Sequence, residues 1–176
     1  MASYHFSVKS KNKGYATGHY LYISRLMQYE GIRKTSNETI EHIEPGRCMP
    51  AFVKDPIDFW QAADTYERAN AKAYMEYEIA LPNEFTSEQR KTLIETFLDK
   101  HIVPQQYPHS YAIHNVKSRI SGEDQPHCHL MFSLKADDAL NAAQNSTSNA
   151  ITLKIQPKAV PKKSNFKMAM KTIPLF

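Results

Sequence analysis

The sequence predicts an α+β fold, in which an antiparallel sheet carries helices packed on one of its faces. Apolar and polar residues alternate, as they do in strands, in residues 3–10, 74–82, 109–118 and 127–135. Apolar residues recur at helical spacing in residues 16–31, 55–73 and 87–102. Only the short turn 119–126 separates the last two strands, so we expect them to pair antiparallel.

Local signals support the boundaries of two of these helices. Pro56 suits the first turn of the second helix, because the missing N–H of proline is not needed there. Thr86 followed by Gln89 is a capping box that begins the third helix. Residues 31–56 are polar and contain three prolines, so they are interpreted as a long loop.

The composition fits one globular domain with a hydrophobic core. The 176 residues are 41% hydrophobic and 23% charged, with a formal net charge of +4 that permits nucleic-acid binding without arguing for it. Two cysteines form neither a disulfide framework nor a CxxC metal motif, which favours a reducing cytoplasm. The amino terminus has no apolar segment typical of a signal peptide, and no apolar run is long enough to span a membrane.

The stretch "QPHCHLMFS" places two histidines on one face of a strand. Successive side chains of a strand point to opposite faces, so His127 and His129 share a face and Cys128 takes the other. His114 lies in the neighbouring strand, and a hairpin would bring it beside the pair. Three neutral imidazoles can form an open metal site. The alternative is that His114 is only a polar residue on a half-exposed strand.

Two further groups of residues could belong to such a site. Glu76 and Glu78 share one strand face, where carboxylates can orient metal-bound histidines, although both could also be solvated charges. Tyr15, Tyr22 and Tyr29 are seven residues apart and lie near one face of the first helix. A tyrosine beside a metal-bound phosphate can be a nucleophile, but most such tyrosines belong to the core or its rim.

Taken together, these segments resemble the MobA/MobL relaxases, the plasmid mobilisation nickases of the HUH endonuclease class. The resemblance covers residues 2–138 in six ordered segments: "ASYHFSVKS", HxxYIxR from His19 to Arg25, "MPAFVKDPIDFWQAADTYERAN", "EYEIALPNEFTSEQRKTLIETF", "YAIHN" and "QPHCHLMFS". It implies a sheet of the HUH relaxase type, similar to a palm or RRM fold. The chain departs from the family after the tyrosine, where "RLMQYEG" replaces the frequent R-E-G-K-Y.

The resemblance also implies which residues act. Tyr22 stands at the position of the nucleophile, with Tyr20 as its neighbouring rival, and Glu76 and Glu78 stand on the acidic strand beside the site. The implied metal ligands are His114, His127 and His129, with manganese or magnesium as the ion. The basic residues that could contact DNA phosphates are Lys9, Lys11, Lys13, Arg25, Arg33 and Lys34, although most could form a solvated face.

The implied function is metal-dependent nicking of single-stranded DNA at a plasmid transfer origin. Tyr22 would attack the scissile phosphorus and form a 5′-phosphotyrosyl link, which conserves the bond energy for rejoining. The implied setting is the bacterial cytoplasm, with accessory mobilisation proteins and a type IV coupling protein as partners. Two alternatives remain: a DNA-binding remnant without catalysis, and a zinc-stabilised structural domain that would need Cys128 as its fourth ligand.

The pattern changes after the last strand. We expect a relaxase domain in residues 1–136 that is incomplete at its carboxyl end, and a frameshifted or disordered tail in residues 137–176. Codons permitted for residues 138–163, with one base inserted after Asp138, can be read as DGIERCAEQYFKRYNSKNPTKGGAKK. This peptide resembles what MobA/MobL relaxases carry after the histidine strand, so a frameshift is the favoured interpretation.

Overall fold

The structure is a computed structural model that describes residues 5–30, 38–51, 53–118 and 120–135. Its five-stranded antiparallel sheet has the order β1-β3-β5-β4-β2. The strands are β1 (Phe6–Asn12), β2 (Glu38–Arg47), β3 (Lys72–Ala80), β4 (His109–Lys117) and β5 (Asp124–Phe132). The helices are α1 (Ala16–Ser24), α3 (Pro56–Tyr66) and α4 (Ser87–His101), with short 3₁₀ turns η1 (Met27–Tyr29) and η2 (Val103–Gln105).

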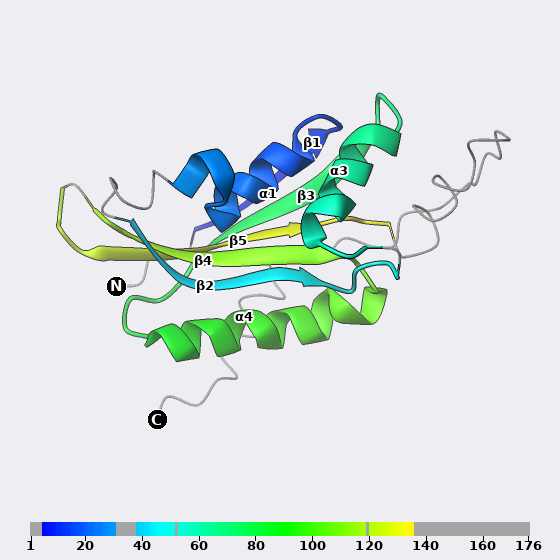
Figure 1. The fold of residues 1–176 in the computed structure, drawn as a ribbon. Coiled ribbons are helices and arrows are strands. Elements are labelled where there is room, and N and C mark those ends of the chain that lie inside the picture. The colour runs from blue at the N-terminus through cyan, green and yellow to red at the C-terminus, as the bar shows by residue number, and fades with distance from the viewer. Residues whose placement is uncertain (1–4, 31–37, 52, 119, 136–176) are drawn as a thin grey trace, which may run out of the picture.

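The α+β class and the antiparallel sheet are confirmed, but the helices cover both faces of the sheet instead of one. Helices α1 and α3 lie on one face and α4 lies on the other (Figure 1). The stripe of Leu93, Ile94 and Phe97 on α4 packs against the larger core cluster, which includes Cys128. A second cluster lies between the sheet and α1 and α3, around Phe59 and Trp60. Because apolar residues of the central strands point both ways, each face needs its own cover.

The interpretation of residues 31–56 as a long loop is wrong for most of the described part. Residues 38–47 form the edge strand β2, which pairs antiparallel with β4. The register shifts between Ile40 and His42 and again between Glu44 and Arg47. Such irregularities interrupt the alternation of inward and outward side chains, which explains why this strand was not recognised from the sequence.

The helix beginnings agree with the expected signals, but the first two helices end early. Helix α3 was expected to reach residue 73 but ends at Tyr66, and β3 begins at Lys72. The capping box of Thr86 and Gln89 is present, and Pro56 follows an Asp55 cap. Helix α1 was expected to reach residue 31 but ends at Ser24, because Arg25 adopts the left-handed conformation that terminates a helix. Tyr29 is therefore not on the same helix as Tyr22, although their rings remain in contact at 5.6 Å between centroids.

The expectations for the tail lie outside the described residues, as do Arg33 and Lys34.

Candidate active site

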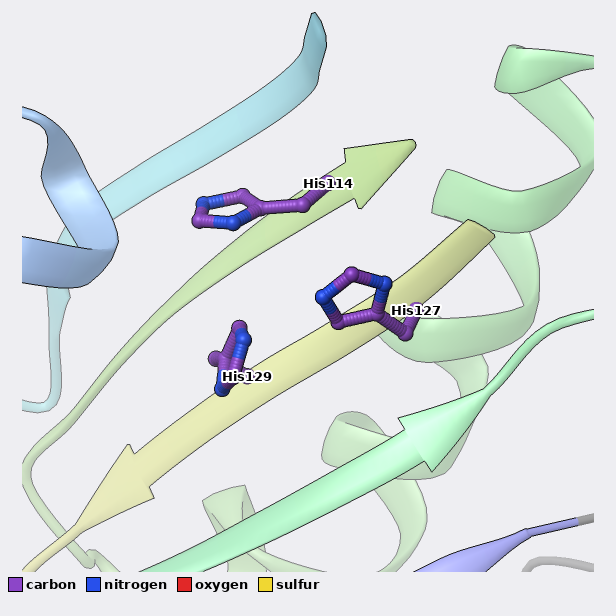
Figure 2. A group of neighbouring side chains, drawn as sticks. All are labelled: His114, His127 and His129. Atoms are coloured by element: carbon purple, nitrogen blue, oxygen red, sulfur yellow. The ribbon is translucent and has the colours of Figure 1, made fainter. Parts of the chain in front are cut away.

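Three histidines meet on the face of the sheet that α1 and α3 cover. His114 of β4 is directly opposite His127 of β5, and His129 lies two residues further along β5. The ring centroids are 5.0–5.7 Å apart, and one nitrogen from each ring lies within 4.8 Å of the others. Figure 2 shows the three rings gathered above the two strands. Cys128 points to the opposite face and is fully buried in the α4 cluster, so it is not a fourth ligand here.

Each of these histidines has one ring nitrogen engaged by an oxygen acceptor. Nδ1 of His127 donates to the carbonyl of Gln125 over 3.0 Å, and Nδ1 of His129 donates to Oε1 of Glu76 over 2.8 Å. Nε2 of His114 donates to the carbonyl of Ile23 over 2.7 Å. A neutral imidazole has one N–H, so the other nitrogen of each ring keeps a lone pair.

Burial favours the neutral form of two of the three rings, those of His114 and His127. Burial lowers the pKa of His114 to about 4, and burial also lowers the pKa of His127. Burial alone would raise the pKa of Glu76, but hydrogen bonds from His129 and His19 outweigh it and hold that pKa well below its ordinary value. Glu76 therefore remains a carboxylate that orients the ring of His129.

This donor set fits a divalent cation. Nδ1 of His114 is buried without a hydrogen-bond partner and lies 2.7 Å from Oε1 of Glu38. With Nε2 donating, two acceptor atoms face one another. Arg25 pairs with the other oxygen of Glu38, and a cation held by the three histidines would stabilise the His114 side of this contact.

The two expected acidic residues have different surroundings. Glu76 is buried beneath α1, between His129 and His19. Glu78 instead pairs with Lys9, whose hydrogen bond lowers the pKa of Glu78. The structure therefore gives the orienting position to Glu76 and not to Glu78.

Two residues near the site carried no role in the sequence interpretation. His19 on α1 places Nε2 2.9 Å from Oε1 of Glu76, and its ring lies 6.2 Å from that of Tyr22 between centroids. The i, i+3 spacing of His19 and Tyr22 was the available signal, because such residues share a helix face. Glu38, beside His114, was hidden in the unrecognised strand β2.

The two rival tyrosines of α1 differ in access. Tyr20 is only 2% exposed and belongs to the cluster beneath the helix, whereas Tyr22 is 36% exposed. Burial also raises the pKa of Tyr20, which makes its phenolate harder to form. Tyr22 is therefore the tyrosine of this pair that a substrate can reach.

The basic residues fall into two groups. Lys9 and Lys11 occupy alternate positions of β1, paired with Glu76 and Tyr74 of β3, and so lie on the face of the site. Lys13 is exposed in the turn before α1. Arg25 is buried, paired with Glu38 and stacked 4.4 Å from the Tyr22 ring centroid, so the phosphate contact expected of it conflicts with its position.

Helix α1 is anchored at its amino end by Asp64 of α3. The Asp64 carboxylate accepts hydrogen bonds from the backbone N–H groups of Gly14, Ala16 and Thr17 over 2.6–2.9 Å, and from Oγ1 of Thr17. No side chain of α1 caps the helix from its own N-cap position. The position of Tyr22 therefore depends on a contact between two helices.

The sequence of this chain is similar to a known protein family. A sequence model of the MobA/MobL family matches residues 15–169. The match continues past Asp138, where the resemblance described above ends, and the expected domain boundary at residue 136 stays a prediction.

Curated relatives also match most of this chain. The chain is 44% identical over 142 residues to the 43 kDa relaxation protein of Salmonella typhimurium, and 37% identical over 143 residues to Mobilization protein A of Escherichia coli. Each alignment covers 80% of this chain, but only 37% and 19% of the lengths of those relatives. The chain thus spans well under half of either protein.

A solved structure shares the fold. It was reported as the molecular basis of vancomycin resistance transfer in Staphylococcus aureus, and it matches with a TM-score of 0.59 at 19% identity. The match covers 97% of this chain and 88% of that one.

Among the helices that the structure describes, none combines the length and hydrophobicity required to cross a bilayer.

Proposed function

The chain belongs to the MobA/MobL family, and from this premise we propose that it nicks one DNA strand at a plasmid transfer origin. Tyr22 is the nucleophile in this proposal, and His114, His127 and His129 hold a divalent metal ion. The observation that carries the proposal is the accessible Tyr22 beside His19, on the helix that covers the histidine cluster. The names of the two curated relatives support a role in mobilisation.

The chain's own residues prepare the reaction in two ways. Asp64 and Arg25 hold the two ends of α1, which sets where the Tyr22 hydroxyl is presented. Glu76 and the Gln125 carbonyl fix the rings of His129 and His127. When bound, the metal ion supplies electrostatic stabilisation of charge that develops on the scissile phosphate oxygens.

The proposed reaction is a transesterification. Tyr22 loses its phenolic proton, its oxygen forms a bond to phosphorus, and the bond between phosphorus and the 3′-oxygen breaks. The 3′-oxygen takes up a proton and leaves as a hydroxyl, while the 5′-phosphate stays on Tyr22. The same steps in reverse rejoin the strand, because the phosphodiester energy is conserved in the covalent link.

We assign manganese or magnesium to the site because MobA/MobL relaxases commonly use these ions, although imidazole ligands also suit zinc. Lys9, Lys11 and Lys13 would attract the DNA backbone. In this proposal the chain acts in the bacterial cytoplasm, with accessory mobilisation proteins and a type IV coupling protein as partners.

The direct test is covalent capture of a labelled origin strand. Purified protein is incubated with a single-stranded origin oligonucleotide, with manganese or with EDTA, and denaturing gels detect the protein–DNA adduct. We expect an adduct only with metal, which Tyr22→Phe abolishes while DNA binding persists. Tyr20→Phe is the matched control, and loss of the adduct in that variant alone would transfer the nucleophile to Tyr20. DNA binding without any adduct would favour the alternative of an inactive DNA-binding remnant.

The metal site has its own test. Calorimetric titration with manganese should show at least about tenfold weaker binding in His114→Ala, because even outer-shell changes produce losses of that size. His101→Ala, at the end of α4 on the opposite face, is the control and should bind as the unmodified chain does. Equal affinity in His114→Ala would remove His114 from the site.

A further inference from the structure

Exposed apolar side chains gather around Tyr22. Within the described residues, seven large hydrophobic side chains are exposed, and four of them fall between residues 15 and 27: Tyr15, Tyr22, Leu26 and Met27. Tyr15 is 61% and Met27 is 63% exposed, so water covers much of both side chains. A concentration of this kind beside a candidate active site indicates a surface that a ligand covers.

The backbone that presents two of these side chains is strained. Arg25 and Met27 have φ angles of 51° and 53°, in the left-handed region that non-glycine residues avoid. Leu26, between them, is extended and exposed. The left-handed conformation of Arg25 ends α1, whereas that of Met27 belongs to no helix end, and strain of this kind concentrates at ligand-contacting and catalytic positions.

Two of the exposed side chains, Tyr15 and Tyr22, stand at the two ends of α1. Tyr15 and Tyr22 are seven residues apart, which puts them on nearly the same side of the helix and about 10 Å apart along its axis. Leu26 and Met27 follow directly after the helix has ended. We call Tyr15, Leu26 and Met27 the apolar rail, whose members precede and follow Tyr22 in the chain.

A positive charge lies beside the rail. Nζ of Lys11 lies 5.9 Å from the centroid of the Tyr15 ring, and Lys9, on the same face of β1, pairs with Glu78. Exposed rings interleaved with cations are the pattern by which proteins bind single-stranded nucleic acid, since the bases stack while the cations meet phosphates. A purely apolar partner would gain nothing from the charge of Lys11.

We propose that the apolar rail binds unpaired nucleobases on both sides of the scissile phosphate. Tyr15 stacks on a base on one side, and Leu26 and Met27 contact a base on the other side, as apolar side chains do when they wedge against bases. This inference rests on the proposed function, because it takes the nicked strand as the ligand. It adds a base-contacting surface to a site otherwise described by its metal and its nucleophile.

The test separates base contacts from phosphate contacts. Fluorescence anisotropy measures binding of the protein to fluorescein-labelled dT20 and to an abasic 20-mer with the same backbone, at several salt concentrations. The unmodified chain should bind dT20 more tightly than the abasic strand. In the triple variant Tyr15→Ser, Leu26→Ser, Met27→Ser we expect dT20 binding to weaken by about fivefold or more, a loss typical of one stacked base.

Three features distinguish a base contact from a general structural effect. Abasic binding and the salt dependence of binding should stay unchanged in the triple variant, because the phosphate contacts remain. Met27→Gly should weaken dT20 binding while raising the melting temperature, since glycine removes both the side chain and the strain. Tyr66→Ser, at an exposed tyrosine of α3, is the matched control and should bind both strands normally.

Other outcomes overturn the inference in recognisable ways. Equal binding of dT20 and the abasic strand by the unmodified chain, or unchanged dT20 binding by the triple variant, refutes the rail while the proposed nicking still stands. Equal losses on both strands would also refute the rail, because a base contact predicts a loss on dT20 alone. Failure of the unmodified chain to bind either strand would count against the proposed function itself.

Discussion

Removal of the Asp64 carboxylate should loosen the helix that carries Tyr22. Asp64 belongs to α3, yet it accepts four hydrogen bonds from the beginning of α1, three of them from backbone N–H groups. A carboxylate at this end also interacts favourably with the helix dipole. In Asp64→Ala these donors lose their acceptor, and α1 has no cap of its own to replace it.

The size of the effect follows from those contacts. Hydrogen bonds to charged groups contribute about 1.5–3 kcal/mol each when buried, but Asp64 is half-buried and water can reach part of this helix end. We therefore count about 1 kcal/mol for each of the three backbone N–H groups, or about 3 kcal/mol in total. For a chain of this length, that corresponds to a melting temperature lower by about 6–12 °C. Asp64→Asn keeps one acceptor oxygen and should lose about half as much.

Urea unfolding followed by circular dichroism measures the loss directly. The control is Asp99→Ala, which removes an exposed ion pair with Arg47 and should change the free energy of unfolding by less than about 0.5 kcal/mol. Adduct formation through Tyr22 should also slow in Asp64→Ala. A loss of stability no larger than that of Asp99→Ala would refute the anchoring role of Asp64.

Three further predictions address the buried carboxylate, the strained turn and the tail. Because the fold holds the pKa of Glu76 below its ordinary 4.5, its carboxylate stabilises the chain above that pH and this contribution disappears as the pH falls below it. Urea unfolding in EDTA should therefore show stability falling more steeply below pH 4.5 in the unmodified chain than in Glu76→Gln, and parallel pH profiles would contradict this. Met27→Gly should raise the free energy of unfolding by up to about 1 kcal/mol, because glycine accepts a positive φ without strain, and a decrease would show that the Met27 side chain stabilises the turn. Sequencing the coding DNA from Asp138 onward should show that one restored base encodes DGIERCAEQYFKRYNSKNPTKGGAKK, and any other reading ends the frameshift proposal.

The arrangement of the three histidines could be predicted, because it follows from the alternation of side chains along each strand. Alternation within one strand dictates that His127 and His129 share a face, whatever surrounds them. A short turn to the preceding strand is enough to bring His114 opposite His127, as the register confirms. The capping box at Thr86 is equally local, since donor and acceptor lie three residues apart.

Other features could not be predicted because they depend on contacts between distant segments. Strand β2 has an irregular pattern, and its pairing with β4 rather than its own sequence makes it a strand. Its residue Glu38 reaches His114 and also pairs with Arg25, which places a cation expected at the surface inside the fold. Neither the helical nor the strand periodicity of the sequence indicates that Glu38 contacts His114 and Arg25.

The local pattern of residues sets which side chains share a face, whereas the packing of distant elements sets what each face contacts. Tyr20 and Tyr22 have the same chemistry and lie two residues apart, yet packing buries Tyr20 in the cluster beneath α1 and leaves Tyr22 accessible. Glu76 and Glu78 share a strand face, but only Glu76 lies beneath α1, where it meets His19 and His129. The direction of a side chain is fixed by the backbone within a few residues, whereas its burial and partners depend on how distant elements pack.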